Sequence, residues 1–167
     1  MDAHAEMLAE LHRLRRRVPD ITGALLADVD GLLIVSDLLG IDAQNVAALS
    51  AANLGVGHRF AQTVGHGPLR ESVLRASGGW VVCYPAGFAL LTVVAYPVAD
   101  LARLHPEARA AAQRLGDLWE TIRSTDPSRL GPMLADPGAP LAVRTPMATL
   151  PADDRSGTSD RQYPRRI

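Results

Sequence analysis

The side chain types that most often carry out catalysis are present in this sequence, but their spacing does not assemble a reactive site. Five histidines are scattered along the chain, at His4, His12, His58, His66 and His105. A zinc site built on His58 and His66 would need a cysteine or carboxylate ligand close by. Cys83 lies in the apolar run WVVCYP, where we expect a packed thiol. Ser72 stands among charged residues without an evident base, so the sequence predicts no catalytic residue and no metal site.

The stretch GALLADVDGLLIVSD, residues 23–37, contains three aspartates, which raises the question of a metal or phosphate loop. A calcium loop starting at Asp28 would need oxygen ligands at alternate positions, but it would run through Leu32 and Ile34. A phosphate-binding loop would need successive glycines or a helix directly after it. Asp30-Gly31 instead predicts a two-residue type I′ turn between two strands. Asp28, Asp30 and Asp37 are therefore expected to serve the backbone.

The basic residues exclude several classes of function. All 17 are arginine, so the chain has no lysine for a Walker A loop or a Schiff base. The net charge of −1 gives no overall attraction to nucleic acid. We therefore predict a non-enzymatic protein without a cofactor and without a nucleic-acid partner.

Composition divides the chain into two parts. The hydrophobic fraction of 47% and the length of 167 residues suit one core, which we expect in a domain at residues 1–124. Residues 125–167 are rich in proline and lack a regular apolar period, which predicts a disordered tail. No apolar run is long enough to span a bilayer, and the N-terminus lacks a secretion signal. We expect a cytoplasmic protein, with peripheral attachment to a membrane complex as an alternative.

Hydrophobic periodicity predicts the element order αββαβββα. An amphipathic helix over residues 7–18 carries a basic cluster that either faces solvent or meets an acidic partner or a membrane surface. The last helix should begin at Pro106 and end near Ser124. Strands are expected over residues 21–28, 32–37, 69–76, 80–84 and 88–96. The run FALLTVVAY is apolar on both faces and should be central, whereas residues 69–76 should form an edge.

The long helix expected over residues 42–64 carries two different stripes. Val46, Leu49, Asn53, Val56, Phe60 and Val64 should enter the core, and Asn53 should find a hydrogen-bond partner there. The opposite stripe is almost flat and is expected to face outward; it contains Ala48, Ala51, Ala52, Gly55, Arg59 and Gln62. Small residues allow a second helix to approach closely, so this stripe predicts a homodimer surface.

Three phrases in this order resemble a known family. VPDITGALLADVDGLLIVSD, DAQNVAALSAANLGVGHRFAQTVG and GGWVVCYPAGFALLTVVAYPVADL look like the roadblock/dynein light-chain family, particularly its bacterial, GTPase-associated members. The resemblance covers about residues 5–124. It implies an α/β (α+β) fold, a three-layer sandwich with a five-stranded antiparallel sheet, the long second helix on one face and the terminal helices on the other. Two features depart from the family pattern: the turn at residues 85–87 is short, and VADLARLH lacks a glycine often found there.

The resemblance also implies partners. Such domains commonly homodimerise by joining sheet edges and pairing second helices, and they bind or regulate a small Ras-like GTPase, sometimes beside a sensor kinase. The predicted dimer or partner surface then also includes Leu69, Glu71 and Val73 on the edge strand. The alternative function is a small-ligand sensor of a similar αβ sandwich fold, for which Asn53 and Tyr84 are the main candidate contacts.

Overall fold

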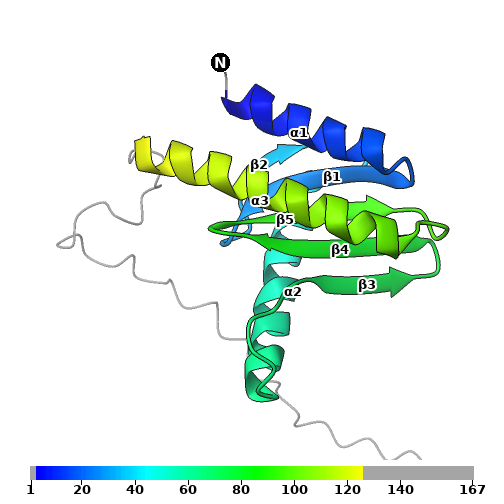
Figure 1. The fold of residues 1–167 in the computed structure, drawn as a ribbon, viewed down its shortest axis with the longest axis vertical. Coiled ribbons are helices and arrows are strands. Elements are labelled where there is room, and N and C mark those ends of the chain that lie inside the picture. Colours follow the sequence, from blue (N-terminus) through cyan, green and yellow to red (C-terminus); the bar gives the residue numbers. More distant parts are fainter. Residues whose placement is uncertain (1–2, 126–167) are drawn as a thin grey trace, which may run out of the picture. The chain divides into compact units, whose positions relative to one another are not determined.

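The computed structural model describes residues 3–125, and the predicted disorder of residues 125–167 falls almost wholly outside this range. Eight elements follow the predicted order αββαβββα (Figure 1). They are α1 (Ala3–Arg17), β1 (Ile21–Asp28), β2 (Leu33–Ser36), α2 (Ala43–Thr63), β3 (Ser72–Ala76), β4 (Gly79–Ala86), β5 (Ala89–Ala95) and α3 (Leu101–Thr125).

The five strands form one antiparallel sheet in the order β2-β1-β5-β4-β3. The central position of β5 confirms the prediction from its apolar faces, because Leu90 and Leu91 point to opposite faces and both are buried. β3 lies at one edge, as its polar sequence predicted. In the register of the sheet, Leu91 pairs with Leu26 on one side and with Tyr84 on the other.

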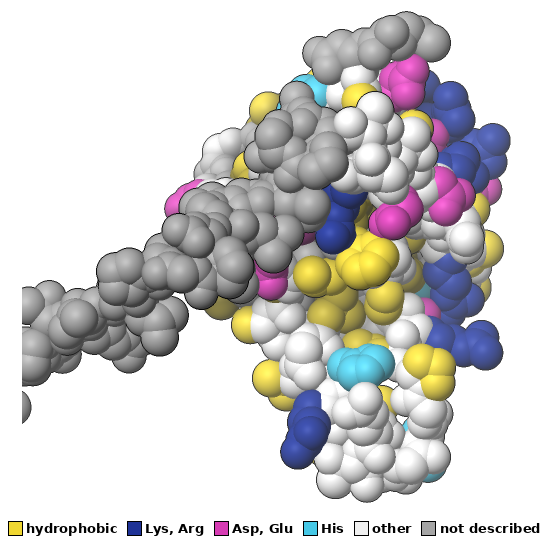
Figure 2. All heavy atoms as spheres, turned by 90° about the vertical axis from the view of Figure 1, so that its left-hand side faces the viewer, with side chains coloured by type: hydrophobic (Ala, Val, Ile, Leu, Met, Phe, Trp, Pro, Cys, Tyr) yellow, Lys and Arg dark blue, Asp and Glu magenta, His cyan; other side chains and the backbone are white. Residues whose placement is uncertain are grey.

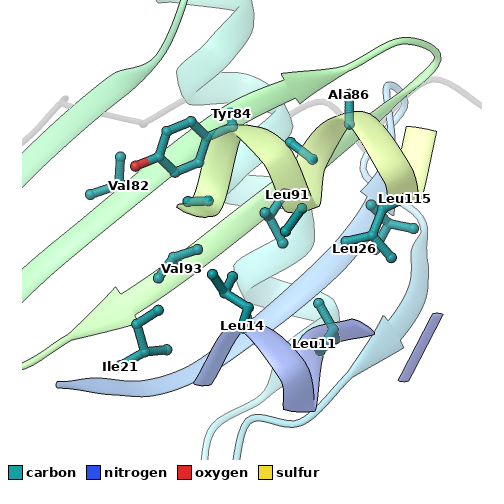
Figure 3. Packing of buried hydrophobic residues seen from close by; sticks show 14 of the residues in the cluster. Leu11, Leu14, Ile21, Leu26, Val82, Tyr84, Ala86, Leu91, Val93 and Leu115 are labelled. Atoms are coloured by element: carbon teal, nitrogen blue, oxygen red, sulfur yellow. The ribbon is translucent and has the colours of Figure 1, made fainter. Parts of the chain in front are cut away.

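Helices cover both faces of the sheet, which confirms the three-layer arrangement. α1 and α3 lie on one face, where leucines of both helices meet Ile21, Leu26, Leu91 and Val93 (Figure 3). α2 lies on the other face, above Leu25, Ala27 and Leu90. β1 and β5 alternate between these two layers, as strand pleating requires.

The turn between β1 and β2 is one residue longer than predicted. Asp28 N–H donates to the Leu32 carbonyl at 3.0 Å, so three residues rather than two connect the paired positions. Gly31 N–H closes the turn onto the Asp28 carbonyl, and Gly31 has a φ of 84°. The Asp28 carboxylate also accepts from the N–H groups of Asp30 and Leu32, which confirms its role in holding the backbone.

The last helix begins earlier than predicted, at Leu101, so Pro106 lies inside it. The Asp100 side chain accepts from the N–H of Ala102 and its carbonyl accepts from Leu104, so Asp100 caps the helix. Pro106 has no N–H to bond to the carbonyl of Ala102. Ala102 is an exposed residue near the start of the helix. The cap therefore decided the helix start, not the proline.

The buried face of α2 is also not the predicted one. Ala47 and Ser50 are buried, and Ala43, Ala51 and Leu54 pack against the strands beneath them. Val46 packs with them, as expected, but the other large apolar residues that were expected in the core lie on the outside: Leu49, Val56, Phe60 and Val64. Small residues on the inner face let the helix backbone approach the sheet closely, and this close packing fixes the rotation of the helix.

Candidate interaction surface

The outer side of α2 carries three large apolar side chains. Leu49, Val56 and Phe60 are 62%, 70% and 69% exposed. Steps of seven and four residues place them on one stripe of the helix. Single exposed apolar residues are common on protein surfaces, but an aligned set of this size indicates an interaction site. Sequence reasoning placed these residues in the core, because spacing alone does not say which of two helix faces is covered.

The predicted outer residues of α2 divide into two groups. Ala48, Ala52, Gly55, Arg59 and Gln62 are exposed, on the same side of the helix as the apolar stripe or next to it. A side chain added at Gly55 would meet no atom within 4 Å, so the surface is open there. Ala51, in contrast, packs against the inner cluster and does not belong to the outer surface.

β3 is exposed on both of its faces. Val73 and Leu74 point to opposite sides of the sheet, and both are exposed. Among residues 3–125, no strand pairs with the outer edge of β3. Unpaired backbone groups on an edge strand can pair with a strand of another chain. The outer side of α2, with Leu49, Val56 and Phe60, and the edge strand β3, with Val73 and Leu74, together are called the α2–β3 surface below.

A small polar network holds β3 against α2. The Asn53 amide donates to Ser72 Oγ at 3.0 Å and contacts Cys83 Sγ at 3.6 Å, while Ser72 Oγ also lies 3.2 Å from Asn53 Oδ1. Asn53 thus has the hydrogen-bond partner that was predicted, although at the rim of the helix contact. The Thr92 hydroxyl donates to the same sulfur, so Cys83 is a buried packed thiol, as expected.

Two residues of the predicted partner surface are turned inward. Leu69 covers Gly57 of α2, where an added Cβ would lie 3.0 Å from the leucine side chain. Glu71 is held by Arg109 of α3 through two hydrogen bonds of 2.6 and 3.1 Å. The hydrogen bonds from this guanidinium hold the pKa of Glu71 below its usual range. Both residues brace the segment that leads into β3 and offer little to a partner.

The two residues suggested for a small-ligand pocket lie on opposite faces of the sheet. Asn53 reaches β4 from the α2 side, whereas Tyr84 belongs to the core beneath α3. The Tyr84 hydroxyl lies 2.8 Å from His105 Nδ1, and burial raises the pKa of this tyrosine. They do not line one cavity, but Tyr84 is among the residues that line a surface cavity between β4 and α3, so the sensor alternative stays a prediction.

Two further observations concern metal ions and membranes. Within the described range, no three His, Cys, Asp or Glu side chains gather as they would around a metal ion. None of the described helices is long and apolar enough to cross a membrane.

Comparison with known proteins assigns the family. The model of the Roadblock/LC7 domain matches residues 7–95, and the chain belongs to this family. The chain is 29% identical over 96 residues to the uncharacterized protein MJ1340 of Methanocaldococcus jannaschii. This match covers 57% of this chain and 84% of the relative.

Solved structures show the same fold. The Roadblock/LC7 domain from Streptomyces avermitilis is 26% identical, with a TM-score of 0.62 over 67% of this chain and 96% of that one. The gliding protein MglB from Thermus thermophilus is 20% identical, with a TM-score of 0.65 over 72% and 93%. A structure described as MglB with tetrameric arrangement is 21% identical, with a TM-score of 0.67 over 72% and 93%.

Proposed function

We propose that this chain forms a homodimer through the α2–β3 surface, and that the dimer is a non-enzymatic regulator or scaffold for a small Ras-like GTPase in bacterial signalling. The observation that carries the proposal is the exposed stripe of Leu49, Val56 and Phe60 beside an open edge strand. Membership of the Roadblock/LC7 family and the likeness to MglB structures support the class of function.

The physical argument for a dimer is the apolar area that a second copy would cover. Burying a leucine, valine or phenylalanine side chain contributes about 1.5–3 kcal/mol. A twofold axis brings the same stripe of both copies together, so the dimer buries each of these side chains in both copies. The exposed Ala48, Ala52 and Gly55 allow the two helices to approach closely, and paired β3 edges would continue the sheet.

The residues of this chain favour regulation by binding over regulation by a reactive group of its own. Without lysine, the chain has no Walker A loop with which to hold a nucleotide. A partner that holds the switch segments of a GTPase in one arrangement changes its activity without supplying a reactive group. A sensor kinase complex at a membrane is a further partner consistent with this function.

The first experiment measures mass and GTPase binding together. Light scattering at tens of micromolar should give a dimer, and calorimetry with the Ras-like GTPase encoded nearest to this gene should give different affinities for its GDP and GTP-analogue forms. A monomer would contradict the dimer surface. Lack of binding to both nucleotide forms would contradict the regulator function, and GTP hydrolysis by this chain alone would contradict the non-enzymatic assignment.

A second experiment separates two ways of regulating. Arg59 is exposed on the outer side of α2, where it could reach a nucleotide bound to the partner. We expect Arg59→Ala to leave both binding and any stimulated hydrolysis unchanged, because exposed helix arginines are usually solvated. Loss of stimulated hydrolysis with intact binding would show instead that this arginine acts on the nucleotide.

A further inference from the structure

The two edges of the sheet differ in how open they are to a strand from another chain. β3 lies at one edge and β2 at the other (Figure 1). All five residues of β3 pair with β4 without a shift of register. Within residues 3–125, none of the hydrogen bonds from side chains to backbone groups reaches β3. A regular, uncovered edge of this kind is a template for a further strand.

At the other edge, a glutamine of α2 covers the start of β2. The Gln44 amide donates from Nε2 to the Gly31 carbonyl at 3.1 Å, and its Oε1 accepts from the Leu33 N–H at 3.3 Å. The Leu32 carbonyl faces β1, where it accepts from the Asp28 N–H, so the Leu33 N–H one residue later faces away from β1. A residue of a parallel neighbouring strand would bond to these same two groups. The glutamine amide therefore occupies the position of a peptide group from an additional strand.

A β-bulge disturbs the rest of the same edge. Leu26 pairs with Val35, but Ala27 pairs with Leu33, so Ile34 is left without a partner in β1. An extra residue bends a strand and increases its twist, which makes a short edge strand a poor template for pairing. The bulge lies after Leu33 and leaves the backbone before it regular. This earlier part of the edge is the part that the Gln44 amide covers.

The covered part of the β2 edge lies beside exposed apolar side chains. Val29 and Leu32 in the β1–β2 turn are 53% and 62% exposed. This turn lies at the left of Figure 1, and hydrophobic side chains gather in the middle of that face of the molecule in Figure 2. Unpaired backbone groups next to exposed apolar side chains favour the addition of a strand from another chain. Without the glutamine amide, the start of β2 would be such a site.

We propose that Gln44 closes the β2 edge to a second copy of this chain, so that sheets join only at β3 and assembly stops at two copies. A dimer joined at β3 has a β2 edge at each end of its continuous sheet. If these edges also paired, each dimer would bind further dimers and the sheet would extend without closing. The limit of two copies rests on the proposed β3 dimer, whereas the closing of the β2 edge by Gln44 does not.

Gln44→Met in the full chain tests the proposal, because methionine keeps the length of the side chain but has no amide. Sedimentation velocity should show species heavier than the wild type, in amounts that rise with concentration up to a few hundred micromolar. In dilute solution, amide hydrogen exchange at Leu33 should be at least about tenfold faster than in the wild type, and it should slow again as the heavier species form. The matched control is Gln113→Met, at an exposed position of α3, which should sediment like the wild type.

Two further variants keep the test decisive. Gln44→Ala should behave like Gln44→Met, so a packing defect caused by the methionine does not decide the outcome. Gln44→Glu should keep the wild-type mass, because a charge at the edge of each copy opposes pairing. Fast exchange at Leu33 without heavier species in the Met and Ala variants would show that the uncovered edge does not pair, and exchange as slow as in the wild type would show that Gln44 does not cover it. A monomeric wild type with a self-associating Gln44→Met would contradict the β3 dimer and support the closed β2 edge.

Discussion

The two faces of the sheet differ in how completely this chain covers them. Under α1 and α3, large side chains such as Leu11, Tyr84 and Leu115 are fully buried. Under α2, the buried apolar residues are Leu25, Ala27, Ala47 and Leu90, and Val46 and Leu54 pack against them, while other large apolar side chains of the same helix face outward. The first face is complete in one chain. The second leaves large apolar side chains of its helix exposed.

Ion pairs follow the same division. On the complete face, Glu10 bridges Arg13 and Arg114 and thereby joins α1 to α3. Asp37 is buried, accepts from the Ala24 N–H at 2.6 Å and pairs with Arg15. The outer side of α2 has no ion pair within residues 3–125. Charges therefore fasten the helices on one face and leave the other face to apolar contact.

Removing a large side chain from the complete face should give the largest effect on stability. Leu115→Ala leaves a cavity between α3 and the sheet and should lower the free energy of unfolding by about 2–5 kcal/mol. Urea denaturation followed by circular dichroism measures this loss. A loss under about 1 kcal/mol would mean that this core is looser than the packing indicates.

A charge on the incomplete face should act on assembly instead. Phe60→Glu should weaken the proposed dimer at least a hundredfold, because it places a carboxylate among apolar side chains at the proposed twofold interface. Analytical ultracentrifugation measures the dissociation constant. Ala110→Glu, at an exposed position of α3, is the matched control and should not change it. Equal effects of the two variants would remove the distinction between the faces.

The polar contact between α2 and β3 should give a moderate effect. Asn53→Ala removes the hydrogen bonds to Ser72 and should lower the free energy of unfolding by about 1–3 kcal/mol. It should also increase hydrogen exchange in β3 more than in β5, since β3 has few other contacts with α2. Uniform exchange across the sheet in this variant would show that Asn53 does not specifically anchor β3.

The smallest effect should come from the ion pair of Glu71 and Arg109. The folded-state pKa of Glu71 is lowered from its ordinary value of 4.5 by the hydrogen bonds from Arg109. The ion pair therefore contributes stability above about pH 4.5, and this contribution is lost as the pH falls through the folded-state pKa. Glu71→Gln should reduce stability at pH 7 by less than about 1 kcal/mol and remove part of its acid dependence. Identical pH profiles for the variant and the wild type would contradict this assignment.

Local sequence signals predicted the elements because they rest on short-range physics. Period-two and period-3.6 apolar patterns, the Asp42 cap of α2 and the Asp28 turn depend on neighbours within a few residues, and Asp42 does accept from the Asn45 N–H at 3.2 Å. The doubly apolar run of β5 likewise required burial on both faces. The predicted start of α3 was wrong because two local signals, an aspartate cap at Asp100 and a proline at Pro106, both indicate a helix start.

Tertiary structure alone decided which side of α2 faces the sheet. The sequence contains both a large apolar stripe and a small one, and either can be buried when only hydrophobicity is considered. Close packing of the helix backbone on β1 and β5 selects Ala47 and Ser50 as the inner side and leaves Phe60 outside. The contacts of Glu71 with Arg109 and of Phe88 with Val29 and Arg123 join residues far apart in sequence. No local pattern encodes such pairs, because they arise only once the sheet and its helices are assembled.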